Sequence, residues 1–196
     1  SNVDLDSRIR DRDDPKLVAM LANQLWHSDS SFTQPPAKYS LLLACVVTGQ
    51  GGESEFADMR AACDALPQDL AAEVEGLVAE HSAFHSRMQL DDSQYTAEDL
   101  AAFPPVQWPI VRVHPGSKRK TLFIGVHATR IIGRPVPEGR LLLAELLEHA
   151  TQRQFVYRHV WRPGDLVMWD NRAVLHRGRR YDLSQRRELR RSTVED

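Results

Sequence analysis

The sequence has few cysteines, no strong excess of charge of one sign and no long apolar run. The two cysteines, Cys45 and Cys63, stand in unrelated contexts, so we expect buried thiols rather than a disulfide framework or a zinc finger. The formal net charge of −2 favours neither nucleic acid nor an anionic membrane as a partner. No apolar segment approaches the roughly 20 residues that span a bilayer. The polar start also lacks the apolar centre of a secretory signal, so a cytoplasmic location is expected.

The composition is that of a globular domain. The chain has 196 residues, of which 42% are hydrophobic and 27% charged, enough for one sizeable core. No internal repeat or low-complexity segment is present. We therefore expect residues 1–196 to form a single domain.

Periodicity and turn residues predict mainly β structure with helices outside. A helix is predicted near Pro15–Leu21, two short helices between Ala57 and Val78 broken at Pro67, and an amphipathic helix over 137–152. Short strands separated by Gly, Pro and Asp-Asn turns suggest a mostly antiparallel architecture. They are expected at 38–48, 154–161, 165–170, 173–178 and 188–195.

A histidine and an aspartate lie two residues apart in the segment NQLWHSDSSF. If this segment is a strand, His27 and Asp29 share one face. An imidazole nitrogen and a carboxylate oxygen are two ligands for a borderline metal, and a second histidine would complete a facial triad suited to Fe(II). The pair alone is a weak signal, because a surface histidine beside an aspartate is common.

Among the eight histidines, His176 is the best-placed partner. It ends an apolar strand in GDLVMWDNRAVLHRG, just after the Asp170-Asn171 turn. A histidine at the end of a rigid hairpin is well held for ligation, although a structural histidine bonded to a backbone carbonyl fits the same pattern. His149 is expected to be a packing or surface residue of the amphipathic helix.

The C-terminal segment is rich in arginine. Seven arginines lie between Arg177 and Arg191. Strand alternation places Arg187, Leu189 and Arg191 on one face, where each guanidinium could bind a different carboxylate through paired hydrogen bonds. A solvated basic face is the plainer interpretation.

Taken together, these motifs resemble the taurine/2,4-dichlorophenoxyacetate dioxygenase family of Fe(II)- and 2-oxoglutarate-dependent enzymes. The resemblance extends through nearly the whole chain and is most specific in WDNRAVLHRGRRYD, where the 2,4-dichlorophenoxyacetate branch is closest. It implies a double-stranded β-helix core of the jelly-roll, cupin-like type. It also implies small anionic aromatic substrates, homo-oligomers and chains that extend further at the front, so we expect the N-terminal portion to be missing here.

The resemblance also implies roles for particular residues. His27, Asp29 and His176 would be the catalytic metal ligands. Arg187 would bind the distal carboxylate of 2-oxoglutarate, and Ser54 stands where the family usually has a threonine that bonds the same group. Arg191 and Asn23 would face the primary substrate. For His81 and His114, a place at the substrate and a loop or core role both remain open.

The implied reaction consumes 2-oxoglutarate and dioxygen and yields succinate and carbon dioxide, with ascorbate as the reductant in vitro. Because Asp29 is present, hydroxylation is favoured over halogenation. An aryloxyacetate hydroxylated beside its ether oxygen would fall apart to a phenol and glyoxylate. Three alternatives stay open: a catalytically silent or truncated relative that binds anionic ligands, a nucleic-acid-binding protein that uses the arginines, and a zinc hydrolase.

Overall fold

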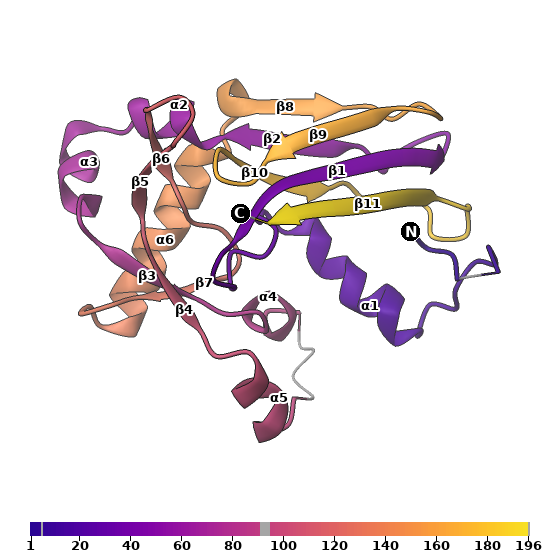
Figure 1. Ribbon diagram of the computed structural model, residues 1–196, viewed down its shortest axis with the longest axis horizontal. Coiled ribbons are helices and arrows are strands. Elements are labelled where there is room, and N and C mark those ends of the chain that lie inside the picture. The colour runs from indigo at the N-terminus through magenta and orange to yellow at the C-terminus, as the bar shows by residue number, and fades with distance from the viewer. Residues whose placement is uncertain (5, 91–94, 196) are drawn as a thin grey trace.

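The computed structural model describes residues 1–4, 6–90 and 95–195. Strands occupy the right of the molecule in Figure 1, and α2, α3 and α6 surround the strands on its left. The pairings between the described strands are antiparallel. The predicted mainly β architecture with flanking helices is therefore confirmed. None of the described helices has the length and apolar character needed to cross a membrane.

The first sheet places the arginine-rich C-terminal strand beside a ten-residue apolar strand. Its order is β11-β1-β9, formed by Glu188–Glu195, Ala37–Val46 and Leu166–Asp170. Alternation along β1 turns Ser40 and Ala44 to the buried face. Leu42 of β1 lies opposite Arg191 of β11. Arg191 and the buried Ser40 therefore belong to the same sheet.

The second sheet carries the histidine of the WDNRAVLHRG motif. Its order is β10-β2-β8, formed by Val174–Gly178, Ser54–Asp58 and Val156–His159. The two sheets meet through aromatic side chains: the Trp169 ring of β9 lies 5.3 Å from Phe56 of β2 and 4.7 Å from His176 of β10, between centroids. A cavity between the two sheets can therefore receive side chains from both ends of the chain.

Two predicted boundaries in this sheet are wrong. The helical pattern expected from Ala57 begins only at Met59, because the Asp58 side chain accepts hydrogen bonds from the Arg60 and Ala61 backbone N–H groups and caps the helix there. The strand expected over 154–161 is shorter, because Arg153–Phe155 forms the 3₁₀ helix η2 before β8.

The middle of the chain forms strands that the sequence did not indicate. One sheet has the order β4-β3-β7 and a two-stranded sheet pairs β5 with β6. Strands of three or four residues are too short to show a clear alternation of apolar and polar side chains. Their bounds are Val78–His81 for β3, Val106–Pro109 for β4, Val111–Val113 for β5, Lys120–Leu122 for β6 and Ala128–Ile131 for β7.

The predicted helices are present. Pro67 separates α2 from α3, and Leu142 and Leu146 of α6 are buried in the core, as the amphipathic pattern requires. The bounds are Pro15–Leu21 for α1, Ala22–Gln24 for the 3₁₀ helix η1, Met59–Asp64 for α2, Gln68–Val74 for α3, His85–Met88 for α4, Ala97–Ala102 for α5 and Val136–Ala150 for α6. The thiols of Cys45 and Cys63 are free, and both residues are half-buried rather than fully buried.

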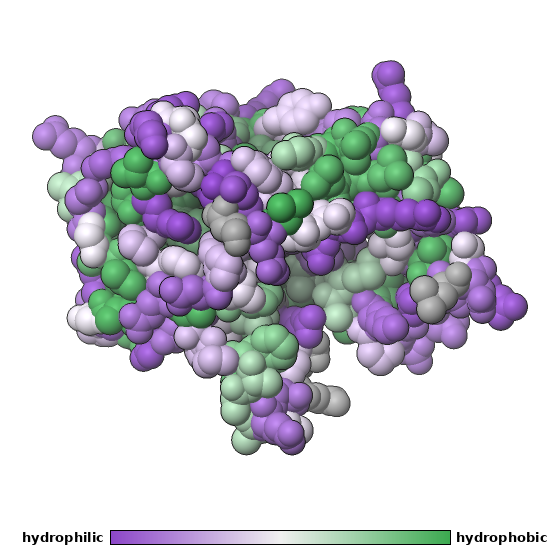
Figure 2. Space-filling view, in the orientation of Figure 1, coloured by the Kyte–Doolittle hydropathy of each residue, from purple (hydrophilic) through white to green (hydrophobic). Residues whose placement is uncertain are grey.

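The outer face of the β11-β1-β9 sheet carries exposed apolar side chains. Leu41 of β1 pairs with Met168 of β9, and Leu43 pairs with Leu166. Leu43, Leu166 and Met168 are exposed, and Figure 2 shows apolar side chains gathered over this part of the molecule.

Candidate metal centre and its cavity

His27 and His176 are held opposite each other by backbone hydrogen bonds. The two residues form an isolated antiparallel bridge, with His27 N–H donating to His176 O at 3.0 Å and His176 N–H donating to His27 O at 2.8 Å. Their rings lie 4.1 Å apart between centroids. The bridge brings together imidazoles from opposite ends of the chain, as the sequence analysis predicted.

Asp29 reaches the same point by a different route from the one expected. The sequence analysis placed His27 and Asp29 on one face of a strand, but Asp29 lies in a turn that follows the bridge residue His27. Asp29 Oδ1 is 3.9 Å from His27 Nε2, and Asp29 Oδ2 is 3.8 Å from His176 Nε2. One ligand atom from each of the three residues lies within 4.8 Å of the others. The convergence is therefore present, whereas the strand geometry proposed for it is not.

The two imidazoles have the protonation state that metal binding requires. Burial lowers the pKa of His176 to about 3, and burial also lowers the pKa of His27 below its ordinary value. Both rings are therefore neutral near pH 7. His27 Nδ1 lies 2.8 Å from the Leu25 carbonyl oxygen, so the proton belongs on Nδ1 and the Nε2 lone pair is left for a metal.

Asp29 stays ionised despite its burial. Burial raises the pKa of its carboxyl group, but electrostatic interactions with His176, His27 and Arg191 and a hydrogen bond from Ser40 outweigh burial and lower this pKa overall. Arg191 Nη1 lies 3.1 Å from Asp29 Oδ1. Two neutral nitrogen donors and one carboxylate suit a divalent transition metal of borderline softness, so the donor set fits such an ion.

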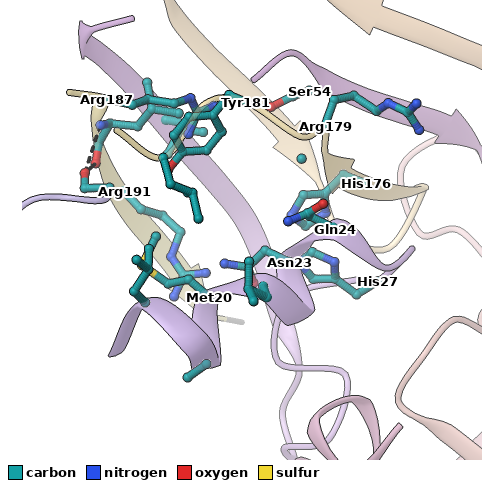
Figure 3. A pocket seen from close by; sticks show the side chains of 18 of the residues that line it. Met20, Asn23, Gln24, His27, Ser54, His176, Arg179, Tyr181, Arg187 and Arg191 are labelled. Carbon is teal, nitrogen blue, oxygen red and sulfur yellow. Dashed lines mark hydrogen bonds between the residues drawn. The ribbon is translucent and has the colours of Figure 1, made fainter. Parts of the chain in front are cut away.

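His27 and His176 line a cavity of about 430 Å³ between α1, η1 and the two sheets, and Asp29 lies beside both histidines. Figure 3 shows His27 and His176 on one side of this cavity and Arg187 with Tyr181 across it. Leu17, Met20 and Leu42 supply apolar surface. The cavity therefore combines two histidines of the candidate metal centre, guanidinium groups and an apolar wall.

Arg187 is a buried cation on the cavity wall. Its side chain donates from Nη2 to Gly52 O at 2.6 Å, and its guanidinium lies 4.9 Å from the centre of the Tyr181 ring. A Cβ on Gly52, which has a φ of +73°, would lie 2.8 Å from Arg187 Nε, so glycine permits this close approach. Only 9% of Arg187 is exposed, which makes it a strong anion site within the cavity.

The remaining predicted site residues also line the cavity. Ser54 is buried, and its hydroxyl accepts a hydrogen bond from Trp161 Nε1 at 3.1 Å. Asn23 lies on η1, and Arg191 extends from β11 with its guanidinium turned into the cavity in Figure 3. The predicted site residues other than Asp29 thus line one cavity, and Asp29 lies beside two of them.

His81 and His114 lie elsewhere among the described residues, and neither lines this cavity. His81 is fully buried, stacks on Phe123 and lies 3.1 Å, through Nδ1, from Ser31 Oγ. His114 Nε2 lies 3.0 Å from Asp170 Oδ2. Of the two roles left open for these histidines, the core role agrees with these contacts.

Sequence reasoning missed the residues that surround the Asp29 carboxylate. Ser40, Trp169 and Asn171 are buried; Ser40 and Asn171 form hydrogen bonds with Asp29, and Trp169 donates to Asn171. The tripeptide Trp169-Asp170-Asn171 was part of the most specific motif, but it was interpreted only as the end of a strand and a turn. Ser40 lies in an apolar strand, where a lone serine is the one signal that could have found it.

Comparison with known proteins agrees with this arrangement. A family model described as taurine catabolism dioxygenase TauD, TfdA family, matches residues 3–193. The chain is 64% identical over 196 residues to alpha-ketoglutarate-dependent 2,4-dichlorophenoxyacetate dioxygenase of Cupriavidus pinatubonensis. This alignment covers 100% of this chain and 68% of the relative. It is 39% identical over 193 residues to (S)-phenoxypropionate/alpha-ketoglutarate-dioxygenase of Sphingobium herbicidovorans, over 95% of this chain and 67% of the relative.

A solved structure is similar over almost the whole chain. The crystal structure of AAD-2 in complex with Mn(II) and N-oxalylglycine superposes with a TM-score of 0.96 at 52% identity, over 99% of this chain and 72% of that one. The chain therefore belongs to the TauD/TfdA dioxygenase family. It spans about two thirds of the length of the curated relatives it matches.

Proposed function

We propose that this chain carries the catalytic centre of an Fe(II)- and 2-oxoglutarate-dependent dioxygenase that hydroxylates a small aryloxyalkanoate such as 2,4-dichlorophenoxyacetate. The observation that carries the proposal is the convergence of His27, Asp29 and His176 at a cavity that is lined by both histidines and by the buried cation Arg187. The names of the two relatives and the Mn(II) and N-oxalylglycine of AAD-2 support it, because N-oxalylglycine has the shape of 2-oxoglutarate.

The two histidines and the aspartate would hold the metal. Three protein ligands on one side of an octahedral ion leave three positions for exchangeable ligands. A metal held by these residues would therefore keep room for 2-oxoglutarate and dioxygen. When bound, iron supplies the activation of dioxygen, while the protein supplies ligand geometry and binding of the two organic substrates.

The arginines of the cavity assign a place to each carboxylate. Arg187 is buried and would bind the distal carboxylate of 2-oxoglutarate, with the Ser54 hydroxyl as a second donor. Arg191 is more exposed and lies beside Asp29, so it would bind the carboxylate of the primary substrate near the metal. Asn23 would contact the same substrate, and Leu17 and Met20 would pack against its aromatic ring.

The overall reaction balances without a further reagent. 2-Oxoglutarate, dioxygen and the aryloxyacetate give succinate, carbon dioxide and a substrate hydroxylated beside the ether oxygen, so each product acid receives one oxygen atom. The hydroxylated carbon is a hemiacetal, which breaks its bond to the phenolic oxygen and leaves a phenol and glyoxylate.

The β11-β1-β9 and β10-β2-β8 sheets would be the two halves of a double-stranded β-helix in a single domain over residues 1–196. Their aromatic contact and the His27–His176 bridge at the metal support this assignment. Assembly into a homo-oligomer, a cytoplasmic location and the absence of nucleic-acid binding stay predictions from the sequence.

The proposal is tested by a substrate panel with the full-length protein. Oxygen uptake, succinate and phenol are measured with Fe(II), 2-oxoglutarate and ascorbate for aryloxyacetates, aryloxypropionates and simple aromatic acids. We expect at least one aryloxy acid to give equal amounts of succinate and phenol, and His27→Ala to give neither. Normal turnover by His27→Ala would rule out the metal assignment, and a wild type that binds the acids without releasing succinate would indicate a binding module instead.

A further inference from the structure

A closed ring of hydrogen bonds surrounds Asp29. Ser40 Oγ donates to Asp29 Oδ2 at 2.6 Å, Asn171 Nδ2 donates to Ser40 Oγ at 2.9 Å, and the Asp29 backbone N–H donates to Asn171 Oδ1 at 3.2 Å. The exposed fractions of Asp29, Ser40 and Asn171 are 6%, 0% and 2%. Because the ring is buried, a lost hydrogen bond is not readily replaced by water.

The chemistry of the donors fixes the direction of each bond. Asn171 Oδ1 also accepts from Trp169 Nε1 at 3.0 Å. Both the indole N–H and the backbone N–H of Asp29 can only donate, so the oxygen of the Asn171 amide must face them and its NH₂ group must face Ser40. The single hydroxyl proton of Ser40 is then directed to Asp29 Oδ2.

The ring is anchored to strand β1 and to the segment between His27 and Asp29. Asn171 N–H donates to Lys38 O at 2.9 Å, and Asn171 O accepts from Ser28 Oγ at 2.7 Å. The Trp169 ring that orients the Asn171 amide also lies against His176, 4.7 Å between centroids. One buried cluster therefore contacts both the aspartate and the second histidine of the proposed centre.

We propose that Ser40 and Asn171 are positioning residues for the Asp29 ligand, an inference that rests on the proposed metal centre. The ring holds the carboxylate in one orientation, so that it meets the metal without a loss of side-chain freedom on binding. Partners of this kind behind a metal ligand typically change metal affinity or activity by about 10- to 100-fold when removed. Ser40 and Asn171 act through Asp29 rather than on the substrate.

The test is Mn(II) affinity, measured by the electron paramagnetic resonance signal of free Mn(II), together with the line shape of bound Mn(II). Ser40→Ala is expected to weaken Mn(II) binding about 10- to 100-fold and to broaden the bound signal. Ser40→Thr keeps the hydroxyl and is expected to stay within about threefold of the wild type. Thr121→Val is the matched control, since Thr121 is buried and its hydroxyl has no hydrogen-bond partner among the described residues.

Asn171→Asp gives a second, nearly isosteric test. An aspartate at this position still accepts from Trp169 and from the Asp29 backbone, but its other oxygen cannot donate to Ser40. The Ser40 proton would then be shared with the new carboxylate, so we expect Mn(II) binding at least as weak as in Ser40→Ala. Near-ultraviolet circular dichroism establishes that each metal-free variant is folded.

The outcomes separate this inference from the proposed function. Tight Mn(II) binding by the wild type and equally tight binding by folded Ser40→Ala or Asn171→Asp would overturn the positioning role alone. Equal weakening by Thr121→Val would do the same, because the effect would then be a general loosening of the core. A wild type that does not bind Mn(II) would overturn the metal centre, and this inference with it.

Discussion

Two clusters of buried histidines lie next to each other in this molecule, and only one of them is suited to bind a metal. The first contains His27 and His176, and the second contains His81 and His127; the rings of His27 and His127 are 6.2 Å apart between centroids. Burial lowers the pKa of His176 and of His127 to about 3, and that of His81 to about 4. Neutral imidazoles are thus common to both clusters.

The difference lies in what each cluster has beside the imidazoles. The first has the ionised Asp29 and an open cavity, whereas the nearest polar partners of the second are the Ser31 hydroxyl of His81 and the Ser82 carbonyl of His127. The arginines differ too. Arg187 faces the cavity, whereas the Arg112 guanidinium lies over the rings of Trp108 and Phe123. Burial keeps a histidine neutral and so able to bind a metal. A metal centre also needs a nearby carboxylate and open space for other ligands, which the first cluster has.

The largest expected effect is on metal binding. His176→Ala removes one of three ligands and should weaken Mn(II) binding by more than about 100-fold, beyond the range for an outer partner. His81→Leu should leave the affinity within about threefold of the wild type. Mn(II) titration followed by electron paramagnetic resonance measures both. Similar losses of Mn(II) affinity in the two variants would contradict the conclusion that only the first cluster binds the metal.

The second-largest expected effect is on the affinity for 2-oxoglutarate. Arg187→Leu removes the buried partner of a carboxylate, which costs about 2–5 kcal/mol and so raises the dissociation constant about 30-fold or more. Arg112→Leu is the matched control and should leave this constant unchanged, although it should lower the melting temperature. Calorimetric titration of the Mn(II)-loaded proteins checks this pair. An unchanged affinity in folded Arg187→Leu would remove Arg187 from the 2-oxoglutarate site.

His81 of the second cluster should contribute to the loss of stability in acid. Burial, with Arg112 as a second cause, lowers the pKa of His81 from 6.5 to about 4. The unfolded chain therefore takes up this proton near pH 6.5 and the folded chain only near pH 4. The stability that neutral His81 contributes is complete above about pH 6.5 and is lost as the pH falls toward 4, by up to about 1.4 kcal/mol per pH unit.

Urea unfolding of the wild type and of His81→Leu at pH 5, 6 and 7 measures this contribution. The variant should show a shallower loss of unfolding free energy between pH 7 and pH 5, whatever its stability at pH 7. Parallel curves for the two proteins would show that His81 keeps its ordinary pKa when folded.

The smallest effect concerns Ser54. Ser54→Ala removes one neutral hydrogen bond donor, worth about 0.5–1.5 kcal/mol, and should raise the dissociation constant of 2-oxoglutarate about 2- to 12-fold. Ser54→Thr restores the hydroxyl, and with it the affinity. Comparison of both variants with Arg187→Leu shows which donor, Ser54 or Arg187, contributes more to 2-oxoglutarate affinity. A loss in Ser54→Ala as large as in Arg187→Leu would show that Ser54 acts by more than one hydrogen bond.

Some features of the molecule can be predicted from local sequence patterns, whereas others depend on the fold. The amphipathic period of α6 and the Pro67 break were sufficient to place those helices, because local pattern and tertiary burial agree there. The short strands β3 to β7 carry too few residues for a pattern. The convergence of His27, Asp29 and His176 was predicted through a motif, but the reason offered for His27 and Asp29, a shared strand face, was wrong because Asp29 lies in a turn.

The outer partners of the site were beyond sequence reasoning for a physical reason. Ser40 and Asn171 are 131 residues apart in the chain and meet only because β1 and β9 pair in one register. Neither residue type is unusual in its local segment. Only the pairing of the strands makes a serine in an apolar strand and an asparagine in a turn neighbours of Asp29, the proposed metal ligand.

The central claim is that two imidazoles and one carboxylate hold a single metal beside a 2-oxoglutarate site. It is tested most directly by anomalous scattering from crystals of the protein grown with Mn(II) and 2-oxoglutarate. We predict one strong Mn(II) peak within coordination distance of His27, Asp29 and His176, with the distal carboxylate of 2-oxoglutarate on Arg187. A peak at other residues, or 2-oxoglutarate bound away from the metal, would contradict the account.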